Sequence, residues 1–477
     1  MLKSISLENY KCFDKLEDLE IAPLTILCGV NSSGKSSILK SLLMLKQSFE
    51  SNYDKNSLLF NGDYTTNGSY ADVVTDHKFT NNVTLSNKFV IENSNFLPTF
   101  EKNTLKDLSN FLLIDNPDLI DKVYITFKII LKRKSSKKYI HDNIIFSYLV
   151  EYDILTKENK QYKNHINISL GENSKYIIDI LSDNLNIEKE YTNCSCFFQG
   201  LTVSNIVTDS NSNSLKPDEL SIIYSLSKII GHQYKGIKYI APLRKEPTRI
   251  YTILQDENDI GLYGEFTPQV IYTHKNDNIS FVLPPQNNIF QTGRKKCSFI
   301  EHINRWCSYL GIEDINIPSD DFNSNIINFK IGHFNYDDVG FGISQILPIL
   351  TTCFLMKWHE TLILQQPEIH LHPKMQMNFA DFLLCSAYTG KNIIIETHSD
   401  HIINRVLRRV LERPLLKDKV KIYFIDKNSQ NNVQEMKIDL VNGFINAPED
   451  FFSQYGSESS AIFNASINNM SNLRLDK

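Results

Sequence analysis

The chain has 477 residues, 42% of them hydrophobic, and its 50 Lys and Arg against 55 Asp and Glu give a formal net charge of −5. A chain of this length can bury a large core and is expected to divide into two or three folding units. The charge balance excludes a surface that binds polyanions as a whole, so any contact with nucleic acid has to come from a local patch.

The cysteines and the hydropathy pattern favour a cytoplasmic protein with no membrane partner. The eight cysteines show no metal-ligand spacing and are expected to be reduced thiols, mostly in the core. No apolar run reaches the roughly 18 residues that a membrane-spanning helix needs. The N-terminal segment MLKSISLENYKCF alternates like a strand and lacks the apolar stretch of a signal peptide.

Residues 29–37, GVNSSGKSS, form the first motif that carries chemistry. They fit G-x-x-x-x-G-K-[ST] and lie between an apolar strand and an apolar helix, which favours a phosphate-binding loop over an ordinary Gly/Ser turn. Lys35 would reach the β- and γ-phosphates of ATP, and Ser36 would ligate Mg²⁺. The residues expected to bind the nucleotide are Asn31, Ser32, Ser33, Gly34, Lys35, Ser36 and Ser37.

In the first half of the chain, the hydrophobic pattern changes after the segment that contains this motif. Residues 1–48 predict strand, strand, phosphate loop and helix, the opening of an α/β nucleotide-binding core. From about 80 to 235, short alternating runs and polar loops predict an antiparallel β-rich insertion with some helix. The basic run KRKSSKK at 132–138 would suit a phosphate backbone, but it lies in a predicted hairpin turn, where a solvated basic turn is more common.

The second half supplies the remaining elements of the core. Residues 298–311 predict an amphipathic helix that ends at Gly311. Residues 361–368, TLILQQPE, and 392–398, NIIIETH, predict two buried parallel strands that end in polar groups. No sustained heptads separate the two halves, so a long coiled-coil arm is not expected.

A glycine-rich turn runs into an apolar helix at residues 338–350, DVGFGISQILPIL. Its glycines or Ser344 could simply cap that helix. In a phosphate-loop ATPase, a second anion site at a helix N-terminus is useful when it faces the nucleotide held by another copy of the chain. Ser344 would then meet the γ-phosphate across a dimer interface.

Seven segments together resemble the ABC-type ATPases of the RecF, SMC and OLD kind. Within that group they resemble a family of bacterial ATPases found in antiphage defence operons, of which the PtuA-like ATPases that act beside an HNH nuclease are one branch. The segments are ENYKCF, GVNSSGKSS, NGDY, IAPLRKEPTRIY, GFGISQILPIL, QQPEIHLHP and ETHSDHIINRV. The resemblance implies a head that dimerises around two ATP molecules, with Gly342 and Ser344 as the signature contact and His398 as a switch histidine that senses the γ-phosphate.

The resemblance also fixes the expected fold and its parts. The expected fold class is α/β, an ABC-type P-loop ATPase head with an antiparallel β-rich lobe and an α/β insertion. Residues 1–80 would form the N-terminal part of the head, 81–235 the β-rich insertion, and 236–477 the C-terminal part of the head.

The chain departs from ABC-type heads at Gln365 and Gln366, where those heads carry an acidic pair. The first carboxylate of such a pair holds Mg²⁺ through water, and the second orients the attacking water. Neither glutamine can act as a general base, so we expect Gln365 beside Mg²⁺ with slow turnover. Glu368 is the remaining carboxylate, and a catalytic role and a role in the loop after the strand are both open. His370 and His372 alternate like metal ligands, although a packed interface is more common for such a pair.

Several absences narrow the function. After Val406, Asp426 in FIDKNS stands alone, so the acidic set of a TOPRIM nuclease is missing, and no HNH, His-Cys or Ser-His-Asp arrangement is present. A target-destroying activity would therefore belong to another polypeptide. Arg244 and Arg249, in PLRKEPTR, are candidates for an anion site or an interface.

These observations give one leading hypothesis and two alternatives. The leading one is an ATPase subunit that forms a head-to-head dimer or higher oligomer on ATP and Mg²⁺. It would sense for or gate a separate effector, an HNH nuclease or a toxin, in antiphage defence. The first alternative is a RecF-like DNA-repair ATPase that binds duplex DNA. The second is a non-catalytic scaffold in which bound nucleotide is structural and the chain sequesters a toxin.

Overall fold

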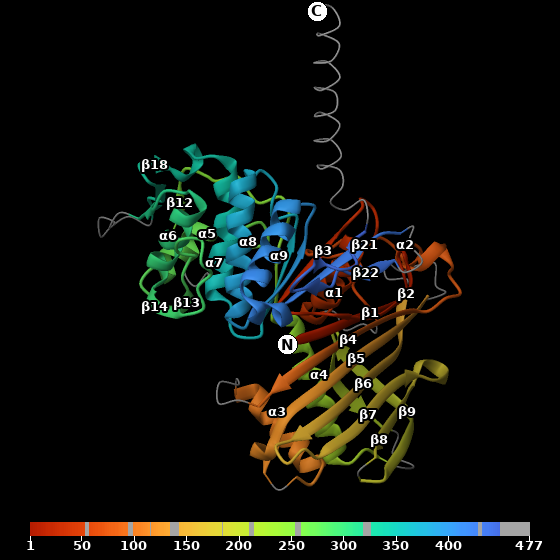
Figure 1. Ribbon diagram of the computed structural model, residues 1–477. Helices are drawn as coiled ribbons and strands as arrows, with labels where there is room; N and C mark the ends of the chain where they lie inside the picture. Colours follow the sequence, from red (N-terminus) through yellow and green to blue (C-terminus); the bar gives the residue numbers. More distant parts are fainter. Residues whose placement is uncertain are drawn as a thin grey trace, which may run out of the picture.

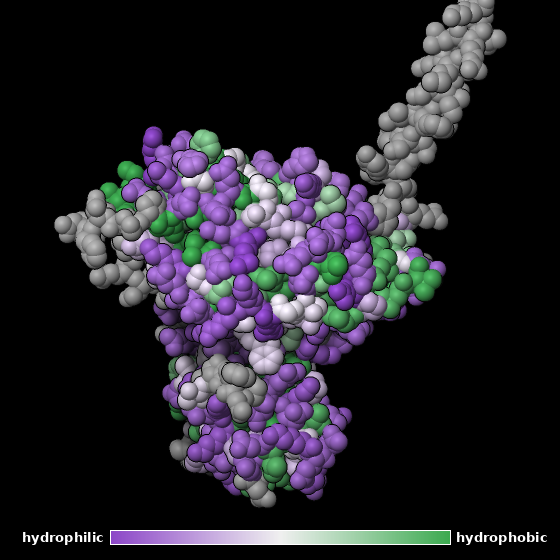
Figure 2. Space-filling view, turned by 60° about the vertical axis from the view of Figure 1, so that its left-hand side comes forward, coloured by the Kyte–Doolittle hydropathy of each residue, from purple (hydrophilic) through white to green (hydrophobic). Residues whose placement is uncertain are grey.

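The computed structural model describes ten ranges of the chain. They are 1–52, 57–93, 99–114, 116–133, 143–183, 185–208, 214–252, 259–317, 326–427 and 432–448. These residues form a head, built on a mainly parallel sheet, and a lobe built on an antiparallel sheet that extends away from the head (Figure 1). In the space-filling view the lobe is a narrower body beneath the head, and hydrophobic side chains are scattered among hydrophilic ones on the face shown (Figure 2).

The sheet of the head has six strands within the described ranges, in the order β11-β19-β20-β3-β21-β22. They are β3 (Leu24–Gly29), β11 (Ile237–Ile240), β19 (Thr361–Gln365), β20 (Asn392–Glu396), β21 (Val420–Ile425) and β22 (Val433–Glu435). All neighbours are parallel except β21 and β22. The expectation of two buried parallel strands is confirmed, because β19 and β20 pair directly and Gln365 lies opposite Glu396.

The described helices lie on both faces of this sheet and beside the lobe (Figure 1). They are α1 (Lys35–Glu50), α2 (Tyr70–Val73), α3 (Thr99–Phe111), α4 (Pro217–Lys235), α5 (Thr267–His274), α6 (Phe299–Leu310), α7 (Phe341–Leu355), α8 (Pro373–Tyr388) and α9 (Asp400–Glu412). Strand residues alternate between two cores: Leu27 and Ile394 pack with α1 and the lobe, whereas Ile26 and Ile395 pack with α5 to α9. Strands buried on both faces explain the continuous apolar runs in the sequence.

The lobe is an antiparallel sheet in which nine of the described strands follow the order β10-β9-β8-β7-β6-β5-β4-β1-β2. They are β1 (Leu2–Tyr10), β2 (Phe13–Glu20), β4 (Val83–Glu92), β5 (Ile120–Arg133), β6 (Asn143–Thr156), β7 (Gln161–Leu170), β8 (Tyr176–Ser182), β9 (Ile187–Gln199) and β10 (Thr202–Val207). Leu7 of β1 lies opposite Leu85 of β4, so this sheet runs without interruption across residue 80. Helices α3 and α4 lie beside it (Figure 1).

The remaining strands are short and lie mostly around α5 and α6 (Figure 1). Their pairs are β12 (Tyr251–Thr252) with β16 (Ile326–Ile327), β13 (Asn278–Val282) with β14 (Arg294–Ser298), β15 (Ile315–Asn316) with β17 (Lys330–Ile331), β17 with β18 (Phe334–Asn335), and β23 (Ile438–Asp439) with β24 (Gly443–Phe444). Helix α6 ends as expected at Gly311, whose φ of 82° is the left-handed conformation that glycine adopts most readily.

Several general expectations can be compared with this fold. The α/β class with an antiparallel β-rich lobe is confirmed. All eight cysteines lie in described ranges as free thiols, and every one except the half-buried Cys12 is buried. Within the described residues, no helix is both long enough and apolar enough to span a bilayer.

The basic run KRKSSKK is only partly described. Lys132 lies over the ring of Phe146, and Arg133 lies over the ring of Phe79. The rest of the run, residues 134–138, lies outside the described residues. The two described cations therefore pack on aromatic rings of their own chain.

Candidate nucleotide-binding site

The phosphate loop joins β3 to α1 and is held in a conformation that needs its glycines. Gly29 and Gly34 have φ values of 129° and 111°, and Ser32 also has a positive φ, 59°. A Cβ on Gly29 would lie 2.1 Å from the carbonyl oxygen of Ile425, and one on Gly34 would lie 2.4 Å from Sγ of Cys12. Both positions therefore exclude a side chain, and the loop backbone turns tightly at the N-terminus of α1.

The side chains of the loop differ in their exposure. Asn31 and Ser32 are exposed, and Ser36 and Ser37 are half-buried. Ser33 is buried, and its hydroxyl has no hydrogen-bond partner among the described residues. The carbonyl oxygen of Ser33 lies 3.8 Å from the thiol of Cys12, in the turn between β1 and β2.

Lys35 is the charged group of the loop, and only 3% of it is exposed. Its Nζ donates to the carbonyl oxygens of Gly29, at 3.0 Å, and Val30, at 2.5 Å. Burial lowers the pKa of Lys35, and the negative charge of Glu396 opposes this effect. The ammonium group is thus held inside the curve of the loop, as the motif predicts for a residue that meets phosphate oxygens.

Four polar side chains at the carboxyl ends of the strands are joined by hydrogen bonds. Ser36 Oγ donates to Oε1 of Glu396 at 2.6 Å. Gln365 Nε2 donates to Oε2 of the same carboxylate at 3.0 Å, and the hydroxyl of Tyr239 donates to Oε1 of Gln365 at 2.7 Å. The arrangement follows from the topology, because the parallel strands β11, β19 and β20 end at one edge of the sheet.

Glu396 is the residue that sequence reasoning missed. The segment NIIIETH predicted a buried strand, and attention went to His398 at its end. The available signal was that Glu396 closes an apolar strand as Gln365 does, and in the sheet the two lie opposite each other. A carboxylate, and not only an amide, therefore stands beside the loop serine.

Glu368 and His398 meet beside this group. The backbone N–H of His398 donates to Oε1 of Glu368 at 2.7 Å. The side chain of His398 is exposed, two residues beyond Glu396. Desolvation first and then the charge of Lys35 lower its pKa. Gln366 has a positive φ of 44°, and its backbone N–H donates to the carbonyl oxygen of Glu396 at 2.7 Å.

The signature segment lies at the start of α7. Gly342 is close to the backbone of His370, whose carbonyl oxygen would be 3.0 Å from a Cβ at that position. Ser344 is only 2% exposed, and its hydroxyl donates to the carbonyl oxygen of Phe341 at 2.7 Å. The contacts described for Gly342 and Ser344 do not include the phosphate loop, so these expected site residues are not brought to Lys35 within one chain.

Arg244 lies between the signature helix and the ends of the strands. It is 3% exposed, and its Nη1 donates to the side-chain oxygen of Gln345 at 3.3 Å and to the carbonyl oxygen of Pro242 at 3.0 Å. Its Nε and Nη2 are buried without a partner in the described part of the chain. Burial lowers the pKa of Arg244 to about 10, while Tyr239 and then Glu368 oppose this effect. Arg249, the other expected anion-binding arginine, is exposed.

The two histidines of EIHLHP have structural contacts. His370 packs edge-on against Phe341, with ring centroids 4.8 Å apart. His372 caps α8 by accepting a hydrogen bond from the backbone N–H of Lys374 at 3.3 Å. Across the described ranges, no three His, Cys, Asp or Glu side chains come together as a metal cluster would require. Both histidines are exposed, so the packed interface that the sequence favoured for this pair stays a prediction.

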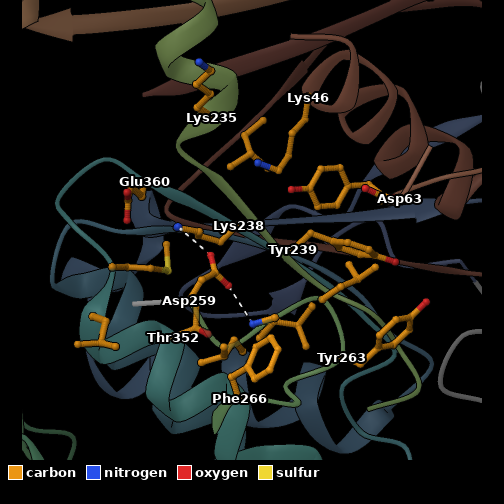
Figure 3. Close-up of a pocket in the computed structure, with 18 of the residues that line it drawn as sticks. Lys46, Asp63, Lys235, Lys238, Tyr239, Asp259, Tyr263, Phe266, Thr352 and Glu360 are labelled. Carbon is orange, nitrogen blue, oxygen red and sulfur yellow. Dashed lines mark hydrogen bonds and ion pairs between the residues drawn. The ribbon is translucent and has the colours of Figure 1, made fainter. Parts of the chain in front are cut away.

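A cavity of about 1090 Å³ lies behind the strand ends, next to the edge strand β11. Lys46 of α1 lies over the ring of Tyr64 at its wall, and Lys238 and Asp259 form an ion pair at 3.4 Å (Figure 3). Tyr239 lines the cavity and also donates to Gln365. The cavity is therefore separate from the phosphate loop and is connected to the site through this tyrosine.

The chain was compared with known families, curated proteins and solved structures. The family described as AAA ATPase domain matches residues 1–403. The chain belongs to this family. No curated protein matches this AAA ATPase. Membership rests on the domain match, which covers the phosphate loop, the signature segment, β19 and β20.

Among solved structures, three head domains are similar in fold to this AAA ATPase. One is an SmcHead bound to the C-winged helix domain of ScpA, with 11% identity, coverage of 92% of this chain and 98% of that chain, and a TM-score of 0.37. The second is the SMC head domain from Thermotoga maritima, with 11% identity, 92% and 99% coverage, and a TM-score of 0.34. The third, a Smc head domain with an extended coiled coil derived from Pyrococcus furiosus and bound to the C-terminal domain of ScpA, has 9% identity, 91% and 95% coverage, and a TM-score of 0.36.

The residues present fit the nucleotide that an AAA ATPase domain uses. The two glycines let the loop backbone pack closely against Ile425 and Cys12, and the hydroxyl of Ser33 is buried without a partner among the described residues. Lys35 and the loop N–H groups would hold the phosphates, while Ser36 would face Mg²⁺, which offsets phosphate charge when bound. Gln365 and Gln366 have no acidic group, so the only carboxylates placed at the site by described contacts are Glu396 and Glu368.

Proposed function

We propose that this AAA ATPase is an ABC-type ATPase subunit that binds ATP with Mg²⁺, dimerises head to head on ATP, and gates a separate effector in antiphage defence. The observation that carries the proposal is the convergence of Lys35, Ser36 and His398 at the carboxyl ends of β3 and β20. The bond between Ser36 and Glu396 ties the start of α1 to the end of β20, and His398 follows Glu396 by two residues.

Dimerisation on ATP is supported by the position of the signature segment, whose described contacts do not include the phosphate loop of its own chain. Gly342 and Ser344 begin a 15-residue helix, and their described contacts stay within the C-terminal half of the chain. The adjacent segment exposes two large apolar side chains, Leu243 at 67% and Ile250 at 62%. Exposed apolar groups beside a helix N-terminus suit a surface that a second copy covers around a shared nucleotide.

Light scattering of the purified chain tests the dimer. The wild-type chain with ATP and Mg²⁺ is expected to double its mass, whereas the chain with ADP is expected to stay monomeric because it lacks the γ-phosphate that the second copy would meet. A mass that does not depend on the nucleotide would contradict the proposal.

A separate effector is supported by the kind of site that the described residues do not form. The described residues hold no cluster of metal-binding side chains of the kind a nuclease needs. Co-expression with the product of the neighbouring reading frame, followed by purification with ATP or ADP, tests the partnership. We expect an effector that co-purifies and whose activity depends on the nucleotide, and an effector that acts identically with either nucleotide would contradict gating.

A nucleotide-bound scaffold is the second candidate, and Gln365 and Gln366 favour it. A site without an acidic residue at either position is expected to hydrolyse ATP slowly, so that bound ATP is retained. Single-turnover measurements separate the two candidates, because a scaffold retains radiolabelled ATP unchanged over hours while a gate converts it to ADP.

A further inference from the structure

The carboxylate of Glu396 lies where a cation is expected in a phosphate-loop site. Its Oε1 accepts the hydroxyl of Ser36 at 2.6 Å, and Ser36 is the residue that the motif assigns to Mg²⁺. Among the described residues, Glu396 is the carboxylate in hydrogen-bond contact with that hydroxyl. The residue on β19 that should supply the acid is Gln365, which is neutral.

The partners of Glu396 leave its charge without a cation in contact. Both described side-chain donors, Ser36 and Gln365, are neutral. The nearby ammonium of Lys35 donates instead to the carbonyl oxygens of Gly29 and Val30. Glu396 is only 4% exposed, and a buried carboxylate with only neutral donors is costly unless a cation offsets its charge.

Gln365 has a role that an amide can fill. Its Nε2 donates to Oε2 of Glu396 at 3.0 Å, while its own oxygen accepts from the hydroxyl of Tyr239 at 2.7 Å. The tyrosine therefore fixes the amide, and the amide fixes the carboxylate. A glutamate at position 365 could not donate this hydrogen bond while ionised, so Gln365 matches a carboxylate at position 396.

We propose that Glu396, at the end of β20, is the acidic residue that faces the nucleotide-bound Mg²⁺, in place of the acid that β19 lacks. Gln365 is its positioning residue. The acidic side chain is thus on β20 and not on the neighbouring strand β19, and the two positions, 365 and 396, lie directly opposite each other in the sheet. This inference rests on the proposed function, because it assumes that the loop binds ATP.

The test measures how strongly Mg²⁺ tightens nucleotide binding, which does not require turnover. Affinity for a fluorescent ATP analogue is determined with Mg²⁺ and with EDTA for the wild type, Glu396→Gln, and the swapped double variant Gln365→Glu/Glu396→Gln. The double variant keeps one carboxylate and one amide in the same pair. Thermal unfolding of each protein in EDTA verifies the fold.

Glu396→Gln is expected to reduce the gain in nucleotide affinity caused by Mg²⁺ at least about tenfold. This is the lower end of the range for groups that support a bound metal. The swapped variant is expected to recover most of this loss, because the charge returns to the same cluster from the neighbouring strand. A purely structural role of Glu396 would instead lower thermal stability and leave the effect of Mg²⁺ unchanged.

The outcomes separate this inference from the proposed function. An equal Mg²⁺ effect in the wild type and in Glu396→Gln would overturn the inference while the nucleotide site stands. If the swapped variant is folded but responds to Mg²⁺ no better than Glu396→Gln, a carboxylate at position 365 cannot replace the one at position 396, and that part of the inference is overturned. Absence of nucleotide binding by the wild type would overturn both the inference and the proposed function.

Discussion

The backbone N–H of His398 donates to Oε1 of Glu368 at 2.7 Å, so a side chain from the loop after β19 holds the residue that follows β20. The other carboxylate oxygen of Glu368 is buried and has no hydrogen-bond partner among the described residues. One oxygen of Glu368 therefore positions the backbone of His398, and the second accepts no hydrogen bond from the described residues. This arrangement allows the positional and the catalytic role of Glu368 to be separated by mutation.

Glu368→Ala is expected to lower the free energy of unfolding by about 1.5 to 3 kcal/mol, the range for a hydrogen bond to a charged group. Glu368→Gln keeps an acceptor oxygen and is expected to lose less stability. Urea denaturation measures both effects, and single-turnover ATP hydrolysis measures the catalytic role. If Glu368→Gln hydrolyses ATP at the wild-type rate, the residue acts only by position.

Lys35→Ala is expected to abolish ATP binding, because the loop loses the positive charge that offsets repulsion between the β- and γ-phosphates. Isothermal titration calorimetry gives the affinity directly. Lys40→Ala, on the same helix but outside the motif, is the matched control and is expected to bind like the wild type. Unchanged affinity in Lys35→Ala would remove the phosphate loop from the proposed mechanism.

Gly340→Asp is expected to prevent ATP-dependent dimerisation and to leave nucleotide binding by the monomer intact. Gly340 caps α7 with an ordinary φ of −57°, and a Cβ there meets nothing within 4 Å, so the variant should fold. The added carboxylate would repel a facing γ-phosphate, whereas Gly340→Ser would not.

Ser344→Arg would also block the contact between the start of α7 and a facing γ-phosphate, but it is a less specific test. Ser344 is buried, so a large side chain would disturb α7 as well as the interface. Light scattering with ATP compares the three variants. A normal dimer in Gly340→Asp would show that the start of α7 does not face the partner's nucleotide.

Tyr239→Phe is expected to weaken the Mg²⁺-dependent part of nucleotide affinity by about tenfold, since removal of a group that orients a metal ligand typically has at least this effect. The variant removes the hydroxyl that fixes the amide of Gln365. Tyr263→Phe, a more exposed tyrosine on the same cavity, is the control. Fluorescence titrations with and without Mg²⁺ distinguish this effect from a general loss of binding.

The stability of the chain is expected to fall as the pH falls from about 6.5 to 4. Burial first, then the α-amino group of Met1, lowers the pKa of His359 to about 4; Glu92 and Glu101 raise it, and Lys3 lowers it. The unfolded chain takes up a proton near pH 6.5 and the folded chain does not, so stability is retained above that pH and lost as the pH falls through the window.

The measurement is urea denaturation at several pH values across this window. His359→Gln is expected to reduce the pH dependence, because it removes one group whose proton uptake differs between the two states. The buried α-amino group of Met1, with its pKa lowered to about 5, supplies the remainder. The exposed His333 provides the control variant His333→Gln. Parallel pH profiles for the wild type and His359→Gln would assign the acid sensitivity to other groups.

Local patterns predicted the elements that carry the site. The phosphate loop, the strands β19 and β20, and the end of α6 at Gly311 each have a signal within a dozen residues: a motif, an apolar run or a helix-ending glycine. The pairing of β1 with β4, in contrast, joins Leu7 to Leu85, and periodicity does not specify which distant strand a strand will pair with. The continuity of the lobe with the N-terminal strands was therefore not predicted.

The site was predicted less completely than the fold. Lys35 and Ser36 were found because their motif is contiguous, whereas the contact between Ser36 and Glu396 spans 360 residues. The sequence also did not predict that Ser344 is buried, because local patterns do not show which other elements pack against the first turn of a helix. Both misses concern tertiary neighbours and not the type of local structure.

The turn between β1 and β2 brings the edge of the lobe sheet into contact with the phosphate loop. Cys12 in this turn touches the backbone of Ser33, and the strands that flank the turn are the last two of the sheet that begins with β10. The end of the lobe sheet and the backbone of the phosphate loop therefore share a contact two residues before Lys35.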